Sequence, residues 1–199
     1  MLLPLFAGKL LRMRNSNLPV VEVNAVSLLM AAIVLLLIPL PWVVAWVCSV
    51  VVHELSHCVA VKLCGGKILA IRIGAGGAAI EIGMLTTGKF VLCSLAGPAG
   101  GQVLLLLANV FPRLALCSLC HCVYNLLPVY PLDGGRVLRR GLEYLPSAKT
   151  AERIEYGILL AVVLLCVWFA IRFSLGIVPL LLAAGLVFQR VKAKVPCKG

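Results

Sequence analysis

The chain has 199 residues, of which 62% are hydrophobic and 13% are charged, and its mean hydropathy is +1.10. A soluble domain is about 45–50% apolar and about 25% charged, so this composition excludes an ordinary soluble protein and predicts an integral membrane protein. The net charge of +11 is compatible with nucleic-acid binding, but the sequence contains no basic module interleaved with aromatic residues. We therefore expect no nucleic-acid partner and an all-α polytopic membrane protein with about six transmembrane helices of about 20 residues each.

The N-terminal part of the sequence predicts a lead-in followed by two spans. Residues 1–23 are basic and are interpreted as a cytoplasmic lead-in. Residues 24–40 form the first predicted span. Because a proline-rich turn follows this span, and not a small-residue cleavage site, we interpret it as an uncleaved helix and not as a signal peptide. Residues 41–63 form the second span, and Gly65 and Gly66 end it, as glycine commonly ends helices.

A different pattern occupies residues 65–89. Strand-like segments at 67–73 and 79–82, separated by a glycine-rich turn, predict a β-hairpin or small sheet inserted between the second and third helices. Two roles for this insertion stay open. It connects two spans, or it offers an unpaired edge strand to an extended substrate peptide.

The remaining sequence predicts four further spans. Residues 90–111 are the third span, and small residues at 96–101 let helices approach closely in lipid. After it come a short fourth span at 114–127, a charged segment at 136–155, spans that run from 155 or 156 to 171 and from 174 to 188, and a basic tail at 189–199. We expect residues 24–188 to form a single transmembrane domain.

Basic residues gather on one side of this six-span topology. Only Arg113 and Arg172 lie on the opposite side, and the other sixteen of the eighteen lie in the N-terminus, residues 62–89, residues 136–155 and the tail. Since positive charge is retained on the cytoplasmic side, we expect a multi-pass cell-membrane protein with both termini in the cytoplasm. The net charge is then mainly a topology signal, with attraction to anionic lipid as a by-product.

The second predicted span carries the pattern His53-Glu54-x-x-His57. Two histidines four residues apart lie on one helix face, so both ring nitrogens can bind one metal ion. Glu54 lies about 100° around the helix, where it flanks the metal and can take a proton from a bound water. The alternative is a pair of neutral packed histidines, with the glutamate paired to a lysine. Ionisable groups are costly inside an apolar span and are usually functional there, which favours a hydrolytic zinc site.

A catalytic zinc ion needs a third protein ligand, with water in the fourth position. The acidic residues available for this role are Glu22, Glu54, Glu81, Asp133, Glu143, Glu152 and Glu155. Asp133 stands out because it follows a short span, in a Pro/Gly turn that can fold back into the helix bundle. In the predicted topology, Asp133, His53 and His57 all lie toward cytoplasmic ends of spans, so their depths agree. The alternative is a turn aspartate that caps the next helix.

Three motifs in this order resemble the site-2 protease family of intramembrane zinc metalloproteases. The motifs are His53-Glu54-x-x-His57 on one span, Ala96-Gly97-Pro98 on the next, and Asn125-x-x-Pro128-x-x-Pro131-Leu132-Asp133-Gly134-Gly135 on the fourth. The resemblance covers residues 40–140 and is closest to the compact bacterial sporulation-type branch, similar to stage IV sporulation protein FB, which releases a membrane-tethered pro-sigma factor.

The resemblance implies roles for five residues. His53, His57 and Asp133 would be ligands of Zn²⁺, Glu54 the general base, and Asn125 a contact of the substrate or the oxyanion. The implied activity is that of a zinc metalloendopeptidase that cuts a peptide bond within or near the membrane. The implied partners are a membrane-tethered substrate such as a pro-sigma or anti-sigma factor in regulated proteolysis, the lipid bilayer, and regulatory membrane proteins.

The sequence departs from the family pattern at Ser56 and Gly101. Ser56 stands where glycine is common, a change that a helix should tolerate. Gly101 stands near a position where the family usually carries asparagine, so we expect altered contacts with the substrate. Nearby, His121 lies four residues before Asn125 on one helix face, and is expected either to support the site or to be a packed or pore-facing neutral histidine.

Two other classes of function stay open. A membrane metal-handling or transport protein would use histidine and aspartate for metal transit, but it would not need Glu54 as a base and typically has more than the three histidines of this chain. A catalytically silent adaptor would keep the fold to hold a partner. The intact ligands and base argue against the adaptor.

Overall fold

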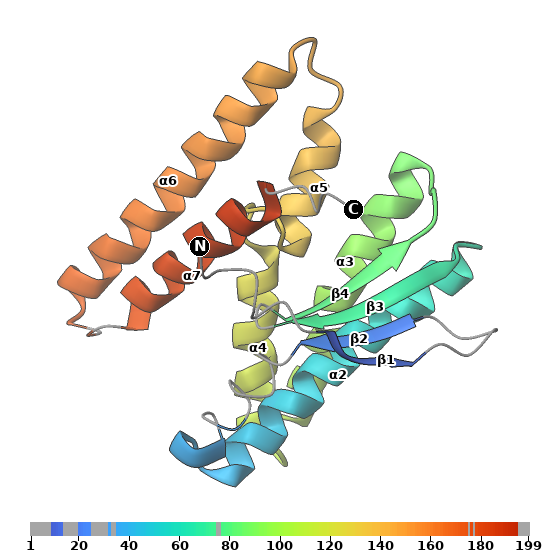
Figure 1. Cartoon of the computed structure of the whole chain (residues 1–199). Coiled ribbons are helices and arrows are strands. Elements are labelled where there is room, and N and C mark those ends of the chain that lie inside the picture. The colour runs from blue at the N-terminus through green and yellow to red at the C-terminus, as the bar shows by residue number, and fades with distance from the viewer. Residues whose placement is uncertain are drawn as a thin grey trace. The chain divides into compact units, whose positions relative to one another are not determined.

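The computed structural model describes residues 9–13, 20–24, 32, 35–74, 77–174, 176 and 178–194 (Figure 1). Contacts between residues group the chain into two compact units, residues 1–123 and residues 124–199. The first unit holds a β-sheet, a helix that lies between its second and third strands in the chain, and the helices that follow the last strand. The second unit holds three helices and the loop that leads into them.

The sheet of the first unit has four strands in the order β1-β2-β3-β4. The strands are β1 (Lys9–Met13), β2 (Val20–Asn24), β3 (Ile68–Gly74) and β4 (Gly77–Ile82). β3 and β4 form an antiparallel hairpin, which confirms the predicted insertion. β1 and β2 come from the segment interpreted as a lead-in, so the sheet is larger than the predicted hairpin. β2 and β3 run parallel, which requires a crossover connection, and α2 lies in that connection.

Helix α2 (Leu40–Leu63) presents one buried face at a spacing of four residues. Its members are Ala45, Ser49, His53, His57 and Val61. Residues spaced by three or four lie on one side of a helix, so this row faces the neighbouring helices while the rest of α2 is largely apolar and exposed. The helix ends at Leu63, and Gly65, two residues later, has a φ of 74° that suits glycine.

Helix α3 (Thr87–Val103) packs directly against α2 and continues into the short 3₁₀ helix η1 (Leu104–Leu107). Two glycines of α3 leave no room for a side chain: a Cβ at Gly97 would overlap the His57 ring, and a Cβ at Gly100 would overlap the Ser56 hydroxyl. The small residues predicted to allow close helix packing therefore do so against the helix that carries the histidines.

Helix α4 (Pro112–Leu126) follows η1 in the chain. Ser118 donates a hydrogen bond to the Gly101 carbonyl (2.6 Å), and the Cys122 thiol donates to the Pro98 carbonyl (3.3 Å). A Cβ at Gly101 would lie 2.6 Å from Cys122 Sγ, so glycine is required for this close approach. The glycine that departs from the family pattern is thus a packing residue between α3 and α4.

The second unit contains α5 (Asp133–Leu142), α6 (Ala148–Arg172) and α7 (Val178–Lys194). Its apolar core is formed by Val129, Leu132, Leu159 and Leu186. Val129 and Leu132 come from the proline-rich loop, while the two leucines come from α6 and α7. The loop that leads into Asp133 is therefore anchored in the core of its own unit.

Within the described residues, three helices are long and apolar enough to cross a membrane: α2, α3 together with η1, and α6. They match the second, third and fifth predicted spans. α7 contains a shorter apolar stretch, Pro179–Val191, and α4 has 15 residues, fewer than the roughly 20 that a span needs. The span predicted at residues 24–40 lies largely outside the described residues.

Candidate metal centre

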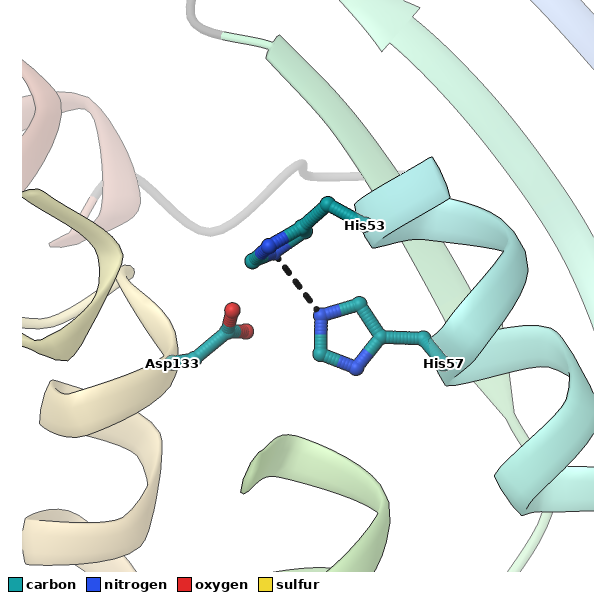
Figure 2. A group of neighbouring side chains, drawn as sticks. All are labelled: His53, His57 and Asp133. Carbon is teal, nitrogen blue, oxygen red and sulfur yellow. Dashed lines mark hydrogen bonds between the residues drawn. The ribbon is translucent and has the colours of Figure 1, made fainter. Parts of the chain in front are cut away.

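The two histidines of α2 point their ring nitrogens toward each other. His53 Nε2 and His57 Nε2 are 3.2 Å apart, and both side chains are buried (Figure 2). His57 Nδ1 is 2.7 Å from the backbone carbonyl of Cys93 on α3. Because a carbonyl only accepts, His57 Nδ1 carries the proton and its Nε2 presents a lone pair. A metal-binding histidine commonly uses this arrangement, in which the second ring nitrogen donates to a carbonyl.

The separation of the two nitrogens fits a shared cation. Two ligand nitrogens at about 2.0–2.1 Å from a tetrahedral zinc ion lie about 3.3–3.4 Å apart. The observed 3.2 Å suits either two ligands of one ion or a hydrogen bond between the rings. The donor set therefore fits a site for one metal ion.

The backbone of Gly97 forms one wall beside these nitrogens. A Cβ at this position would overlap the His57 ring and would lie 2.8 Å from His53 Nε2. The missing side chain leaves room at the point where the two Nε2 atoms converge. The two imidazoles thus lie beside a space that only glycine leaves open.

A third histidine lies against His53. The His121 ring on α4 packs edge to face on the His53 ring, with centroids 4.6 Å apart and planes at 87°. His53 and His57 are related in the same way, with centroids 4.8 Å apart and planes at 82°. All three histidines of the chain therefore form one cluster within the first unit.

Asp133 is the first residue of α5 and is buried. A carboxylate at the N-terminus of a helix is favoured by the helix dipole, and Arg136 Nη1 lies 3.7 Å from Asp133 Oδ1. The two glycines that follow leave no room for side chains: a Cβ at Gly134 would overlap the Leu126 carbonyl, and a Cβ at Gly135 would overlap the backbone of Val129 and Tyr130. The Asp-Gly-Gly sequence thus lets α5 begin tightly against its own loop.

His53 and His57 could each offer one ligand atom to a metal ion, and Asp133, in the second unit, is the third ligand that the motifs predict (Figure 2).

Two further site residues are predicted from the motifs, Glu54 and Asn125. Glu54 is half-buried on the turn of α2 that carries His53. Asn125 is half-buried in the last turn of α4, one turn after His121. The features that sequence reasoning missed are the Cys93 carbonyl and the Gly97 hollow. The Gly-Pro motif was the available signal for the hollow, but small residues in a span are first explained by helix packing.

Comparisons with known proteins agree with these observations. Residues 77–169 match the model of peptidase family M50. A zinc metalloprotease of Methanocaldococcus jannaschii is 35% identical over a 135-residue alignment that covers 58% of this chain and 40% of the relative. The chain thus spans about two fifths of the length of the curated relative that it matches.

A solved structure shares the fold. The site-2 protease from Methanocaldococcus jannaschii superposes with a TM-score of 0.67 and 22% sequence identity, covering 92% of this chain and 94% of that chain. The chain is thus similar to peptidase family M50 over residues 77–169 and shares the fold of a solved site-2 protease.

Proposed function

We propose that this chain is an intramembrane zinc metalloprotease of the site-2 type, which hydrolyses a peptide bond of a membrane-tethered protein. The observation that carries the proposal is the buried, converging histidine pair on an apolar helix, with Glu54 beside it and His57 oriented by the Cys93 carbonyl. The match to peptidase family M50 and the shared fold support the same activity.

His53, His57 and Asp133 would hold the ion. When bound, zinc supplies a Lewis acid that polarises the scissile carbonyl and lowers the pKa of water to about 7. Glu54 would act as the general base, accepting the proton of the attacking water on its carboxylate and passing it to the leaving amine. Asn125 would hold the substrate backbone through its side-chain amide.

The depth of the histidines sets what the substrate must do. His57 and His53 lie six and ten residues before the end of α2 at Leu63, which places them about 9 and 15 Å from that end at 1.5 Å per residue. Water and an extended backbone must therefore reach below the membrane surface. A helical substrate hides its carbonyl groups in internal hydrogen bonds, so the segment to be cut must unwind first.

The sheet offers one way to hold an unwound segment. β4 is an outer strand of the four-stranded sheet and ends shortly before α3 begins. An outer strand can pair with an extended peptide through backbone hydrogen bonds. This supports the more specific of the two roles considered for the insertion, in addition to its role as a connection.

The sporulation-type resemblance points to a transcription-factor precursor as substrate. We propose a membrane-tethered pro-sigma or anti-sigma factor, cut in regulated intramembrane proteolysis. The support for this substrate class is the order and spacing of the three motifs between His53 and Gly135.

Glu54→Gln tests the activity. Co-expressed with candidate membrane-tethered substrates, the wild-type chain should release a cleaved product on an immunoblot, and Glu54→Gln should release none while the purified variant still holds one zinc ion per chain. The amide keeps the shape of the side chain but cannot accept the proton. Glu143→Gln is the matched control, because Glu143 is exposed at the end of α5 and pairs with Arg140.

Cleavage retained in Glu54→Gln would exclude glutamate as the base. A wild-type chain that binds no zinc when purified would exclude the metal site itself. A chain that binds zinc, cuts nothing and moves zinc across vesicles would instead support the metal-transport function.

A further inference from the structure

The orientation of the His53 ring depends on its neighbours. The terminal torsion of a histidine side chain is broad, so rotamer preference alone does not fix the plane of the imidazole. In the first unit, two rings stand perpendicular to His53: His57 at 82° and His121 at 87°. Such edge-to-face contacts between aromatic rings have a preferred geometry and stabilise one ring orientation.

His57 has a support of a different kind. Its Nδ1–H donates to the Cys93 carbonyl at 2.7 Å, which sets both its tautomer and its ring plane. Cys93 lies on α3, so α3 holds the ring of one of the two histidines directly. The contact with His121 is the corresponding support for His53.

His121 is itself held in place by α3. The two hydrogen bonds from α4 to α3 come from Ser118 and Cys122, which flank His121 in the sequence and are almost completely buried. Their acceptors are the Gly101 and Pro98 carbonyls of α3. The His121 ring is thus fixed to the same helix that orients His57 through Cys93.

We propose that His121 is a positioning residue of the metal centre. Its imidazole packs edge to face on His53 and holds that ring so that His53 Nε2 faces His57 Nε2. Since this role serves the metal site, it rests on the proposed function. Residues that orient metal ligands affect metal affinity by about 10- to 100-fold, and a single aromatic contact lies toward the lower end of that range.

The test compares three variants of the full chain purified in detergent: His121→Ala, His121→Phe and Cys120→Ala. Phenylalanine keeps an aromatic ring but has no nitrogen atoms. Cys120 is the exposed neighbour of His121 on α4 and serves as the matched control. After metal removal with a chelator, zinc affinity is measured by competition with a chromophoric chelator, and the visible absorption of the Co²⁺-loaded protein reports ligand geometry.

We expect His121→Ala to bind zinc on the order of 10-fold more weakly and to change the cobalt spectrum. His121→Phe and Cys120→Ala should stay within about 3-fold of the wild type, because both keep an aromatic ring against His53. Melting temperatures of the metal-free proteins show whether each variant is folded. A folded His121→Ala with wild-type affinity and spectrum would overturn the proposal.

Two further outcomes decide between the packing role and other roles. If His121→Phe binds zinc as weakly as His121→Ala, the nitrogen atoms of His121 matter and the packing role is wrong. If the wild-type chain and Cys120→Ala bind no zinc at all, the proposed function fails, and this is seen before any variant at position 121 is compared.

Discussion

Gly97 has no functional group, yet its position is the most restricted one beside the histidines. The space for its absent Cβ is occupied by the His57 ring and borders His53 Nε2. Ser56 on α2 shows that a side chain larger than glycine fits at the next contact between the two helices, where α3 has Gly100. Its hydroxyl donates to the Val52 carbonyl of its own helix at 2.7 Å and lies against Gly100, so a serine is accommodated where glycine is common.

Gly97→Ala should abolish zinc binding. A methyl group cannot be placed without displacing the His57 ring, which also breaks the hydrogen bond to Cys93, and overpacking of this kind typically costs about 1–3 kcal/mol of stability. Zinc per chain, measured by elemental analysis of the purified protein, should fall from one toward zero. Gly88→Ala is the control on the same helix, because nothing lies within 4 Å of a Cβ there. One zinc per chain in Gly97→Ala would show that the hollow is dispensable.

The sequence predicts ligands for the site, but it does not predict the groups that hold the two histidines in place. His53 and His57 carry their signal in residue type and spacing, and Asp133 carries it in a Pro/Gly turn. The Cys93 carbonyl is a backbone group, and any residue at that position would supply it, so it leaves no trace in the sequence. The contact between His121 and His53 depends on where α4 crosses α3, which periodicity along one helix does not define.

At the scale of helices, the largely buried carboxylate of Glu155 links the three helices of the second unit. Glu155 on α6 pairs with Arg190 on α7 and lies 3.5 Å from Arg139 on α5. Both guanidinium groups also lie over the Tyr130 ring, at 4.4 and 5.8 Å from its centroid. Tyr130 belongs to the loop that leads to Asp133, so the cluster joins three helices to that loop.

Glu155→Gln should destabilise the protein strongly. The Arg190 side chain is 5% exposed, and removal of the partner of a buried charge typically costs about 3–5 kcal/mol. Thermal unfolding in detergent, followed by circular dichroism, should show a large fall in melting temperature. Glu143→Gln removes an exposed pair with Arg140 and should change stability by less than about 1 kcal/mol. Equal melting temperatures for the two variants would contradict the importance of the Glu155 cluster.

The strands show which parts of the sheet an alternating sequence pattern can predict. β3 and β4 could be predicted because a hairpin pairs neighbouring segments of alternating residues. β2 has a strand-like Val20-Val21-Glu22-Val23 sequence, but its partner β3 lies beyond a whole helix, and the basic residues around β1 favoured the interpretation as a lead-in. Pairing between distant segments is not encoded in either segment alone.

At the scale of the whole molecule, the charge distribution predicts the orientation in the membrane. A reporter fragment that fluoresces only in the cytoplasm should be active when fused after the last residue or inserted at Gly65, on the side that holds sixteen of the eighteen basic residues. The same fragment inserted at Ala108, next to Arg113, should be silent. Fluorescence from the Ala108 insertion would contradict the predicted orientation, and expression of each fusion is checked by immunoblot.

The parallel pairing of β2 with β3 restricts the parity of the membrane crossings. Neighbouring strands of one sheet lie on the same side of a bilayer, so the chain between Asn24 and Ile68 must cross it an even number of times. α2 is long and apolar enough for one crossing, so an even number needs a second one, which the span predicted at residues 24–40 would supply. A chain with an odd number would place β2 and β3 on opposite sides and divide the sheet. The pairing of β2 with β3 therefore constrains how many times the segment between them can cross the membrane.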